Sequence, residues 1–264
     1  MKNILRVLCL LASCSAFSQF NFQREISLPI NTTQWFVDPV GNHYLLAGNK
    51  LTKIDSLGEV KFSQAIKSQG EINQLVFNSA QKIISFSEEQ QQICLFDNTI
   101  TPVSTCLSLE EYGIINATCI ASSRRANSVW IYDCVNSTLS LFDIDKKMIQ
   151  QQLKNIKGLI EFGGNTTYFK EDDEKLWISD GSNTFGFDLN LNLTDKFDFS
   201  CTDKQFIENQ TYFEFVDDAF FVLNLSSKEQ GIGENPVPNA TQITFVNGYF
   251  YFKKGSKIYV YKIA

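Results

Sequence analysis

The chain contains one histidine, His43, so an enzyme that relies on an imidazole base would have to use this residue. Such a catalyst needs a nucleophile within hydrogen-bond reach of the base. The neighbours of His43, Asn42 and Tyr44, belong to no nucleophile motif, and the chain has no G-x-S-x-G sequence. We therefore interpret His43 as a turn residue and predict no catalytic residues and no enzyme activity.

Two stretches carry side-chain oxygens that could bind a cation. Asp188, Asn190 and Asn192 alternate as in a calcium loop, but the sixth position lacks glycine and Phe199 replaces the bidentate glutamate. A hairpin turn explains this stretch better. Residues 171–174, Glu-Asp-Asp-Glu, could hold a cation, although a solvated turn before a strand is the simpler interpretation. With one histidine and no C-x-x-C pair, a zinc site is not expected. We predict no metal and no cofactor.

Four cysteines form two pairs, each centred on a predicted turn. Cys94 and Cys106 centre on residue 100, and Cys119 and Cys134 centre between residues 126 and 127. Residues directly opposite each other across a hairpin have Cα atoms about 4.5 to 5.5 Å apart, which is within disulfide reach. Exported proteins meet an oxidising compartment. Both pairs are therefore candidate disulfides, with buried free thiols as the alternative.

The elements that carry these residues recur along the chain. Short aromatic or β-branched runs break at two-residue turns at 41–42, 80–81, 126–127, 173–174, 217–218 and 247–248. The steps between these turns are 39, 46, 47, 44 and 30 residues. A second series, an apolar residue followed by aspartate, ends at Asp55, Asp97, Asp143 and Asp188. A period of this length indicates one four-stranded unit that must pack against its neighbours, which predicts an all-β propeller of six blades.

The first four blades are expected at residues 35–66, 72–109, 118–153 and 159–199. The fifth has a first hairpin at 212–225, and residues 231–238 are then predicted to be irregular because proline removes ladder donors and glycine weakens strands. We therefore expect the fifth blade to be incomplete. The sixth has three strands within 241–264, and residues 20–28 are predicted to add the fourth as a clasp between the two ends of the chain.

The N-terminal residues resemble a cleaved export signal. Residues 1–18 have a basic start, an apolar stretch and small residues at Ala16 and Ser18. Alternatively, residues 11–14 resemble the lipobox of bacterial lipoproteins, in which Cys14 would become the acylated first residue. No later run approaches the roughly 18 apolar residues of a membrane-spanning helix. We predict a single propeller domain at 19–264, exported to the periplasm and either free there or associated with the outer membrane.

The charge balance excludes one class of partner. The formal charge is −6, or −8 once Lys2 and Arg6 leave with the signal, and there is no stripe of basic residues. Because phosphate neutralisation dominates nucleic-acid affinity, we predict no nucleic-acid binding.

At the level of architecture the chain resembles small six-bladed propellers exported by Gram-negative bacteria. It has no Trp-Asp dipeptide, Tyr-Trp-Thr-Asp run or kelch double glycine, so no functional residues transfer from a named subfamily. Propellers of outer-membrane assembly machines, such as the lipoprotein subunit of barrel assembly, are similar in architecture, and the resemblance implies protein binding. Our hypothesis is an accessory subunit or plug of an outer-membrane protein complex, such as a type 9 secretion translocon. A propeller that binds or hydrolyses glycans with carboxylates is the alternative, although no pair can be nominated.

The irregular stretch of the fifth blade is the predicted partner-binding loop. Ile232 stands between two glycines, where strand pairing is not expected to bury it, and Glu234 and Asn235 follow. In the alternative interpretation, Ile232 folds back over the edge left by the missing strands. The loops at 88–92 and 110–116 are the next candidates.

Overall fold

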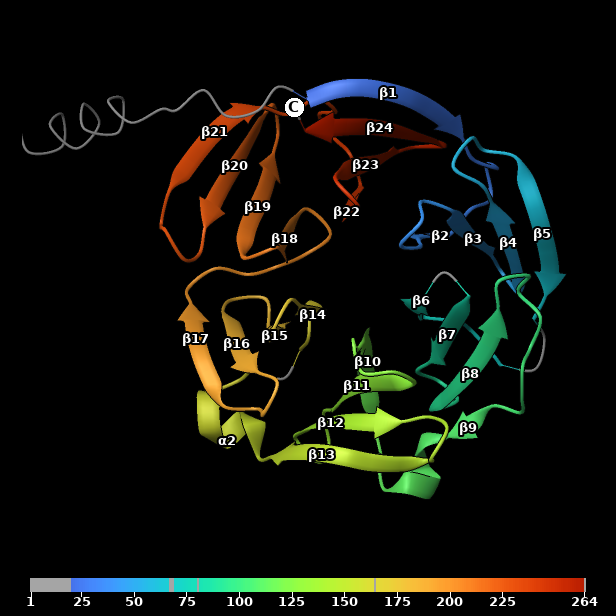
Figure 1. The fold of residues 1–264 in the computed structure, drawn as a ribbon, viewed down its shortest axis with the longest axis vertical. Helices are drawn as coiled ribbons and strands as arrows, with labels where there is room; N and C mark the ends of the chain where they lie inside the picture. Colours follow the sequence, from blue (N-terminus) through green and yellow to red (C-terminus); the bar gives the residue numbers. More distant parts are fainter. Residues whose placement is uncertain (1–19, 67–68, 80, 164, 264) are drawn as a thin grey trace, which may run out of the picture. The chain divides into compact units, whose positions relative to one another are not determined.

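The computed structural model describes residues 20–66, 69–79, 81–163 and 165–263. Their strands form six four-stranded sheets (Figure 1), which confirms the predicted all-β propeller of six blades. The predicted signal, with Cys14, lies outside the described residues. Within the described residues, no helix has the length and apolar character needed to cross a bilayer.

The chain divides into two compact units, which we describe separately. The larger unit, Ser27–Cys201, contains blades one to four. Blade one consists of β2 (Gln34–Val37), β3 (His43–Ala47), β4 (Lys50–Ile54) and β5 (Val60–Ala65), and blade two of β6 (Gln74–Ser79), β7 (Lys82–Ser87), β8 (Gln92–Asp97) and β9 (Leu107–Ser108). Blade three consists of β10 (Ala117–Ser122), β11 (Ser128–Asp133), β12 (Thr138–Asp143) and β13 (Met148–Lys154), and blade four of β14 (Tyr168–Asp172), β15 (Lys175–Ser179), β16 (Thr184–Asp188) and β17 (Leu193–Phe197). The 3₁₀ helix η1 (Leu109–Tyr112) precedes blade three and the short helix α2 (Ile156–Ile160) follows it.

The smaller unit, residues 20–26 with 202–263, contains blades five and six. Blade five consists of β18 (Gln205–Glu208), β19 (Thr211–Val216), β20 (Ala219–Asn224) and β21 (Gln230–Glu234). Blade six consists of β22 (Gln242–Val246), β23 (Tyr249–Lys254), β24 (Lys257–Ile263) and β1 (Phe20–Ser27).

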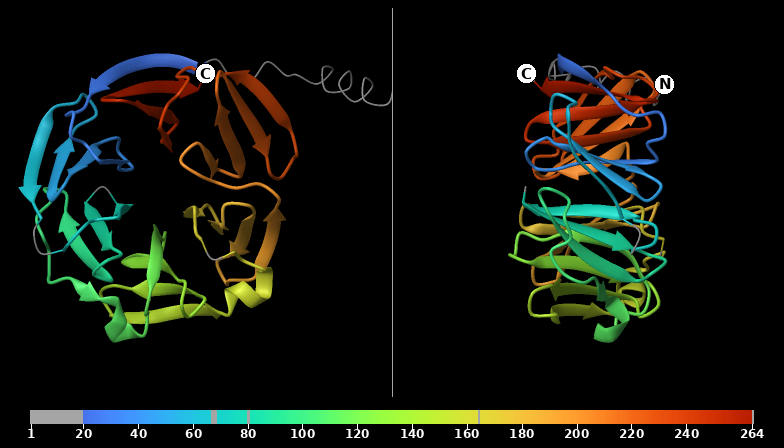
Figure 2. Two further views of the ribbon diagram at one scale, coloured as in Figure 1. Left: turned by 180° about the vertical axis from the view of Figure 1, so that it is seen from behind. Right: turned by 90° about the vertical axis from the view of Figure 1, so that its right-hand side faces the viewer.

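The predicted clasp is confirmed. The order of strands in blade six is β1-β24-β23-β22, so the first described strand completes a sheet made by the last three (Figure 2). Phe20 on β1 places its ring among aromatic rings of both blades of this unit, with centroids 4.9 Å from Phe220 and 5.4 Å from Phe250. At the other end of the pairing, Lys257 forms a 2.6 Å ion pair with Glu25.

The expectation of an incomplete fifth blade is wrong, because Gln230–Glu234 pairs with β20 as a complete outer strand. The glycine that suggested irregular chain has a packing role. A Cβ on Gly233 would lie 2.2 Å from Cε1 of Phe220, so only glycine leaves room for this ring on the neighbouring strand. The predicted start of blade four is also wrong, because Leu159 lies in α2 and the blade begins at Tyr168.

The two sequence series correspond largely to two of the three hairpin turns of a four-stranded blade. In the first series, the turns at 41–42, 126–127, 173–174 and 247–248 join the first strand to the second, and each contains a residue with positive φ. The turn at 217–218 joins β19 to β20, so the hairpin predicted as the first of blade five is its second, because β18 precedes it. The turn at 80–81 includes residue 80, which lies outside the described residues. In the second series, Asp55, Asp97 and Asp188 each accept the backbone N–H groups two and four residues later at 2.8–2.9 Å. These bonds replace the missing ladder bonds of the turn to the outer strand.

Contacts between blades of the larger unit have the same period as the sequence. Lys53 Nζ donates to the carbonyl of Asn98 at 2.9 Å, and Lys82 Nζ donates to Asn127 Oδ1 at 2.5 Å, and in both cases the partners are 45 residues apart. Trp130 and Trp177 are fully buried at matching positions of blades three and four. The repeat therefore specifies the packing between blades as well as the strands.

Candidate functional site

The predicted partner-binding residues lie on or just after β21. Ile232 is 48% exposed and stands directly opposite Phe221, which is 40% exposed, so the two form an apolar pair on one face of the sheet. Glu234 ends the strand and is exposed. Asn235 is buried, because its side chain donates to the carbonyl of Asp217 at 2.8 Å and accepts the N–H of Val237 at 3.1 Å. Asn235 closes a turn and does not present its side chain to a partner.

His43 is a strand residue, so its interpretation as a turn residue is wrong. It lies on β3 with no exposed surface, and Trp35 Nε1 donates to its Nδ1 at 3.1 Å. A buried imidazole in this position orients the indole of the neighbouring strand and is out of reach of a substrate in solvent.

The oxygen-rich stretches make internal hydrogen bonds. Asp188 receives two backbone N–H groups and the amide of Asn192, as expected for a hairpin turn. The Glu171 carboxylate accepts Ser123 Oγ at 2.8 Å and also bonds the Trp130 indole, so it joins blade four to blade three. In the described segments, no group of three or more His, Cys, Asp or Glu side chains could hold a metal ion.

The two cysteine pairs differ. Cys94 and Cys106 form a disulfide, with Cα atoms 4.3 Å apart. Cys119 and Cys134 are free thiols, the alternative considered for these pairs. The hairpin pairs Ser122 with Val129, so it is centred one residue earlier than predicted and Cys119 stands opposite Tyr132. Cys134 donates its N–H to the carbonyl of Asn116. The symmetric hairpin that would have placed the two sulfurs opposite each other is therefore absent. Burial raises the pKa of the Cys119 thiol to about 12, which keeps it protonated.

The two loops named as the next candidates are joined by hydrogen bonds. Gln91, at the turn between β7 and β8, donates its amide to the carbonyl of Ala117 at 2.9 Å and accepts the N–H of Ala117 at 2.7 Å. Its own carbonyl accepts the N–H of Leu109 at 2.9 Å. One buried glutamine thus fixes the end of blade two to both ends of the loop that leads into blade three.

A buried carboxylate then fixes this loop to the hairpin between β11 and β12. Asp133 is 1% exposed. Its Oδ2 accepts the N–H of Ile115 at 2.8 Å and the side-chain amide of Asn136 at 2.8 Å, and its Oδ1 accepts the N–H groups of Val135 and Asn136 at 3.0 Å. Four donors around one carboxylate set the conformation of both segments.

The result is a pair of apolar side chains on a fixed backbone. Ile115 is 48% exposed and Val135 is 62% exposed, and their N–H groups bind the same carboxylate. Glu110 and Glu111, in η1 of the same loop, are exposed. We call Ile115, Val135, Glu110 and Glu111 the blade-three loop surface.

Asp133 and Gln91 were not predicted from the sequence as site residues. Asp133 precedes Asn136 at the end of a strand, and this spacing is typical of an aspartate that caps its own turn. Its bond to Ile115, however, joins residues 18 apart, and its partner could not be identified without the fold.

Comparisons with known proteins define the class by its fold. No protein-family model matches the chain, and no curated protein matches it. Solved propellers do match. BBS1N, in a crystal structure in complex with ARL6DN, has 9% sequence identity and a TM-score of 0.58, with 94% of this chain and 98% of that chain covered.

Two bacterial propellers are also similar. BamB from Moraxella catarrhalis has 11% identity and a TM-score of 0.54, with 95% of each chain covered. A catalytically inactive histidine-to-alanine variant of virginiamycin B lyase from Staphylococcus aureus, with quinupristin, has 13% identity and a TM-score of 0.59, with 89% of this chain and 82% of that chain covered. At these identities the likeness shows the propeller fold alone, which hosts unrelated functions.

Proposed function

We propose that this protein is a non-enzymatic propeller that binds a protein partner through the blade-three loop surface. The observation that carries the proposal is the Asp133 carboxylate, which holds Ile115 and Val135 exposed on two loops of a rigid scaffold. Single exposed apolar residues are common on proteins. At Asp133, one buried carboxylate fixes the backbone of two such residues, one in each of two loops. Binding residues concentrate on loops that a scaffold positions in this way.

We further propose that the partner is an outer-membrane protein, and that the chain serves as an accessory subunit or plug of a complex such as a type 9 secretion translocon. The signal-like residues 1–18 support export to the periplasm. The resemblance to propellers of outer-membrane machines supports the kind of partner. BBS1N provides a similar fold with a protein partner.

A glycan-directed enzyme receives less support. All three tryptophans are at most 1% exposed, so none can stack on a sugar at the surface. The carboxylate of Glu171 is engaged by blade three. A lyase activity also receives no support, because the similar lyase is inactive when a histidine is replaced, whereas the one histidine of this chain is buried against Trp35.

The test is affinity capture from a detergent-solubilised envelope of the source bacterium. The wild type is compared with Val135→Asp and with Val40→Asp as a matched control. Val40 is 60% exposed and its N–H also binds an aspartate, Asp38 Oδ1, at 3.0 Å, but it lies at the β2–β3 turn of blade one. A charge at an interface anchor is expected to cost about 2 kcal/mol or more of binding.

We expect the wild type and Val40→Asp to retain an outer-membrane protein that Val135→Asp loses. Equal capture by all three proteins would remove the blade-three loop surface as the interface. Recovery of the wild type alone under gentle detergent would contradict the proposed function itself.

A further inference from the structure

The outer strand of blade two is much shorter than those of the other blades. β9 has two residues, whereas the outer strand β13 of blade three has seven. Between the Asp97 turn and β9, residues 101–105 are exposed, and Pro102 has no N–H to donate to β8. The Asp97 N–H donates to the carbonyl of Thr101 at 3.0 Å, and the Val103 N–H donates to the carbonyl of Leu95 at 2.9 Å. We call residues 102–106 the strap.

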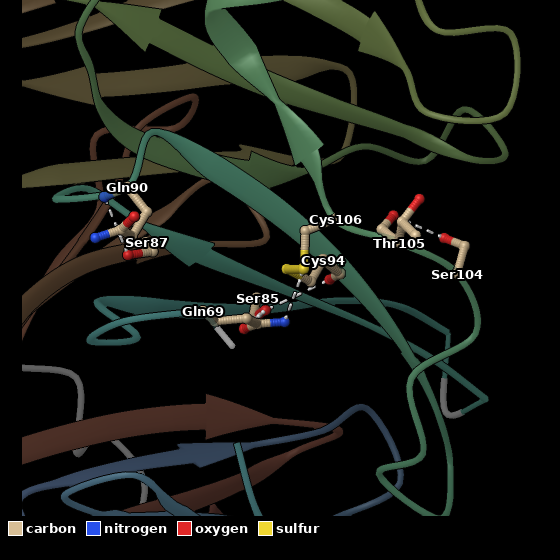
Figure 3. The surroundings of a disulfide bond; sticks show 8 residues. All are labelled: Gln69, Ser85, Ser87, Gln90, Cys94, Ser104, Thr105 and Cys106. Atoms are coloured by element: carbon tan, nitrogen blue, oxygen red, sulfur yellow. Dashed lines mark hydrogen bonds between the residues drawn. A yellow bond between two sulfur atoms is a disulfide. The ribbon is translucent and has the colours of Figure 1, made fainter. Parts of the chain in front are cut away.

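Where β9 is too short to pair with the rest of β8, a disulfide links the two segments. Cys106 at the end of the strap is bonded to Cys94 of β8, which is 2% exposed (Figure 3). From the inner side, the buried Gln69 donates Nε2 to Cys106 Sγ at 3.5 Å, and its Oε1 accepts Ser85 Oγ at 2.7 Å. The strap is thus attached to β8 by this covalent bond and by the hydrogen bond from Val103 to Leu95.

We propose that the Cys94–Cys106 bond is a redox-sensitive disulfide, and that its reduction releases the strap from β8 while the rest of blade two stays folded. Both ends of the strap have independent anchors. At one end, Asp97 Oδ1 accepts the N–H of Thr101 at 2.9 Å. At the other, β9 pairs with Gln92 and Ile93. Release would free the outer backbone edge of β8 at Leu95.

The reductant is a protein dithiol. One of its thiolates attacks Cys106 Sγ, because Cys106 is partly exposed and Cys94 is buried. The S–S bond breaks, and Cys94 leaves as a thiolate that takes up a proton. The second thiol of the reductant then displaces Cys106 and closes the disulfide of the reductant. Two electrons pass from the dithiol to the cystine, and two cysteine thiols remain in the chain.

The size of the effect follows from the loop that the bond closes. The two cysteines are 12 residues apart, and closing a loop of this size changes the opening equilibrium by roughly 100-fold. The anchors at both ends recover part of this. We therefore expect local opening to increase by roughly tenfold or more on reduction.

The test is hydrogen exchange by mass spectrometry on the full chain, oxidised and in dithiothreitol. We expect amide exchange in residues 103–106 to become roughly tenfold faster or more, with no change in β7. A Cys94→Ala/Cys106→Ala double variant should reproduce the reduced pattern without a reductant. The double variant, measured with and without dithiothreitol, controls for any effect of the reductant on the free thiols Cys119, Cys134 and Cys201.

Two results would overturn the proposal. Unchanged exchange in the strap would show that its backbone bonds suffice to hold it. Equal acceleration in β7 would show that the disulfide supports the whole blade, and a double variant that fails to fold would lead to the same conclusion.

Discussion

Replacing Asp133 by asparagine tests whether one carboxylate fixes the blade-three loop surface. The substitution keeps the size of the side chain. Its remaining oxygen can still accept the N–H groups of Val135 and Asn136, which Oδ1 now accepts at 3.0 Å. Its NH₂ group would replace Oδ2, which accepts the N–H of Ile115 and the side-chain amide of Asn136, both at 2.8 Å. Two hydrogen bonds are lost, and the N–H of Ile115 and the side-chain amide of Asn136 then face another donor, the new NH₂ group.

The expected cost can be worked from these bonds. A hydrogen bond to a charged group contributes about 1.5 to 3 kcal/mol, and a buried donor left without an acceptor costs about 1 to 3 kcal/mol. Because such terms overlap, we expect the free energy of unfolding to fall by about 2 to 4 kcal/mol for the two lost bonds.

Urea unfolding followed by tryptophan fluorescence measures this loss. Trp35, Trp130 and Trp177 all lie in Ser27–Cys201, so the signal reports the unit that contains Asp133. The control is Asp145→Asn, because Asp145 is exposed and its ion pair with Lys82 spans 3.5 Å. Such a surface pair contributes at most about 1 kcal/mol. A change of less than about 0.5 kcal/mol for Asp133→Asn, with unchanged exchange at the Ile115 amide, would refute the reasoning.

Two further predictions concern the clasp and the turn aspartates. Deleting residues 1–28 removes β1 and exposes the edge of β24, so we expect aggregation in size-exclusion chromatography. Deleting residues 1–19 leaves β1 intact and should give a monomer. A soluble monomer with unchanged melting temperature for the longer deletion would contradict the clasp. Hydrogen bonds lower the pKa of three turn aspartates. The largest contribution comes from the Thr99 hydroxyl for Asp97, from the Lys146 N–H for Asp143 and from the Asn192 side-chain amide for Asp188. A folded-state pKa below the unfolded value means that this stability is present above about pH 4 and is lost as the pH falls through the lower folded values. Urea midpoints measured from pH 5 to pH 2 should therefore decrease, and Asp97→Asn should make the decrease shallower; equal slopes would count against the assignment.

The parts of the fold that could be predicted from sequence are those that local chemistry decides. A two-residue turn with positive φ and an aspartate that caps its own turn are each contained in five residues, so their recurrence located the blades. The Cys94–Cys106 pair also follows from a symmetric hairpin. The Cys119–Cys134 pair does not form, because this hairpin is centred one residue earlier than predicted, which places Cys119 opposite Tyr132.

The fifth blade shows where local rules fail. Glycine disfavours strands on average, yet Gly233 is in a strand because the ring of Phe220 occupies the space where a side chain would be. This contact lies between neighbouring strands and is absent from any short window of sequence. The Asp133 site has the same character, since its capping role is local but its bond to Ile115 depends on how the chain enters blade three.

The strap and the blade-three loop surface are consecutive in the chain but separately anchored. Between them, Leu109 is fully buried and donates its N–H to the carbonyl of Gln91, whose side chain also holds Ala117. Opening the strap therefore breaks no bond that positions Ile115, and Asp133 holds no residue of the strap. If partner binding depends on the loops and redox sensitivity depends on the disulfide, a substitution can remove either property without the other. Both lie where blades two and three depart from the repeat, and such departures are where a scaffold of repeated parts acquires individual properties.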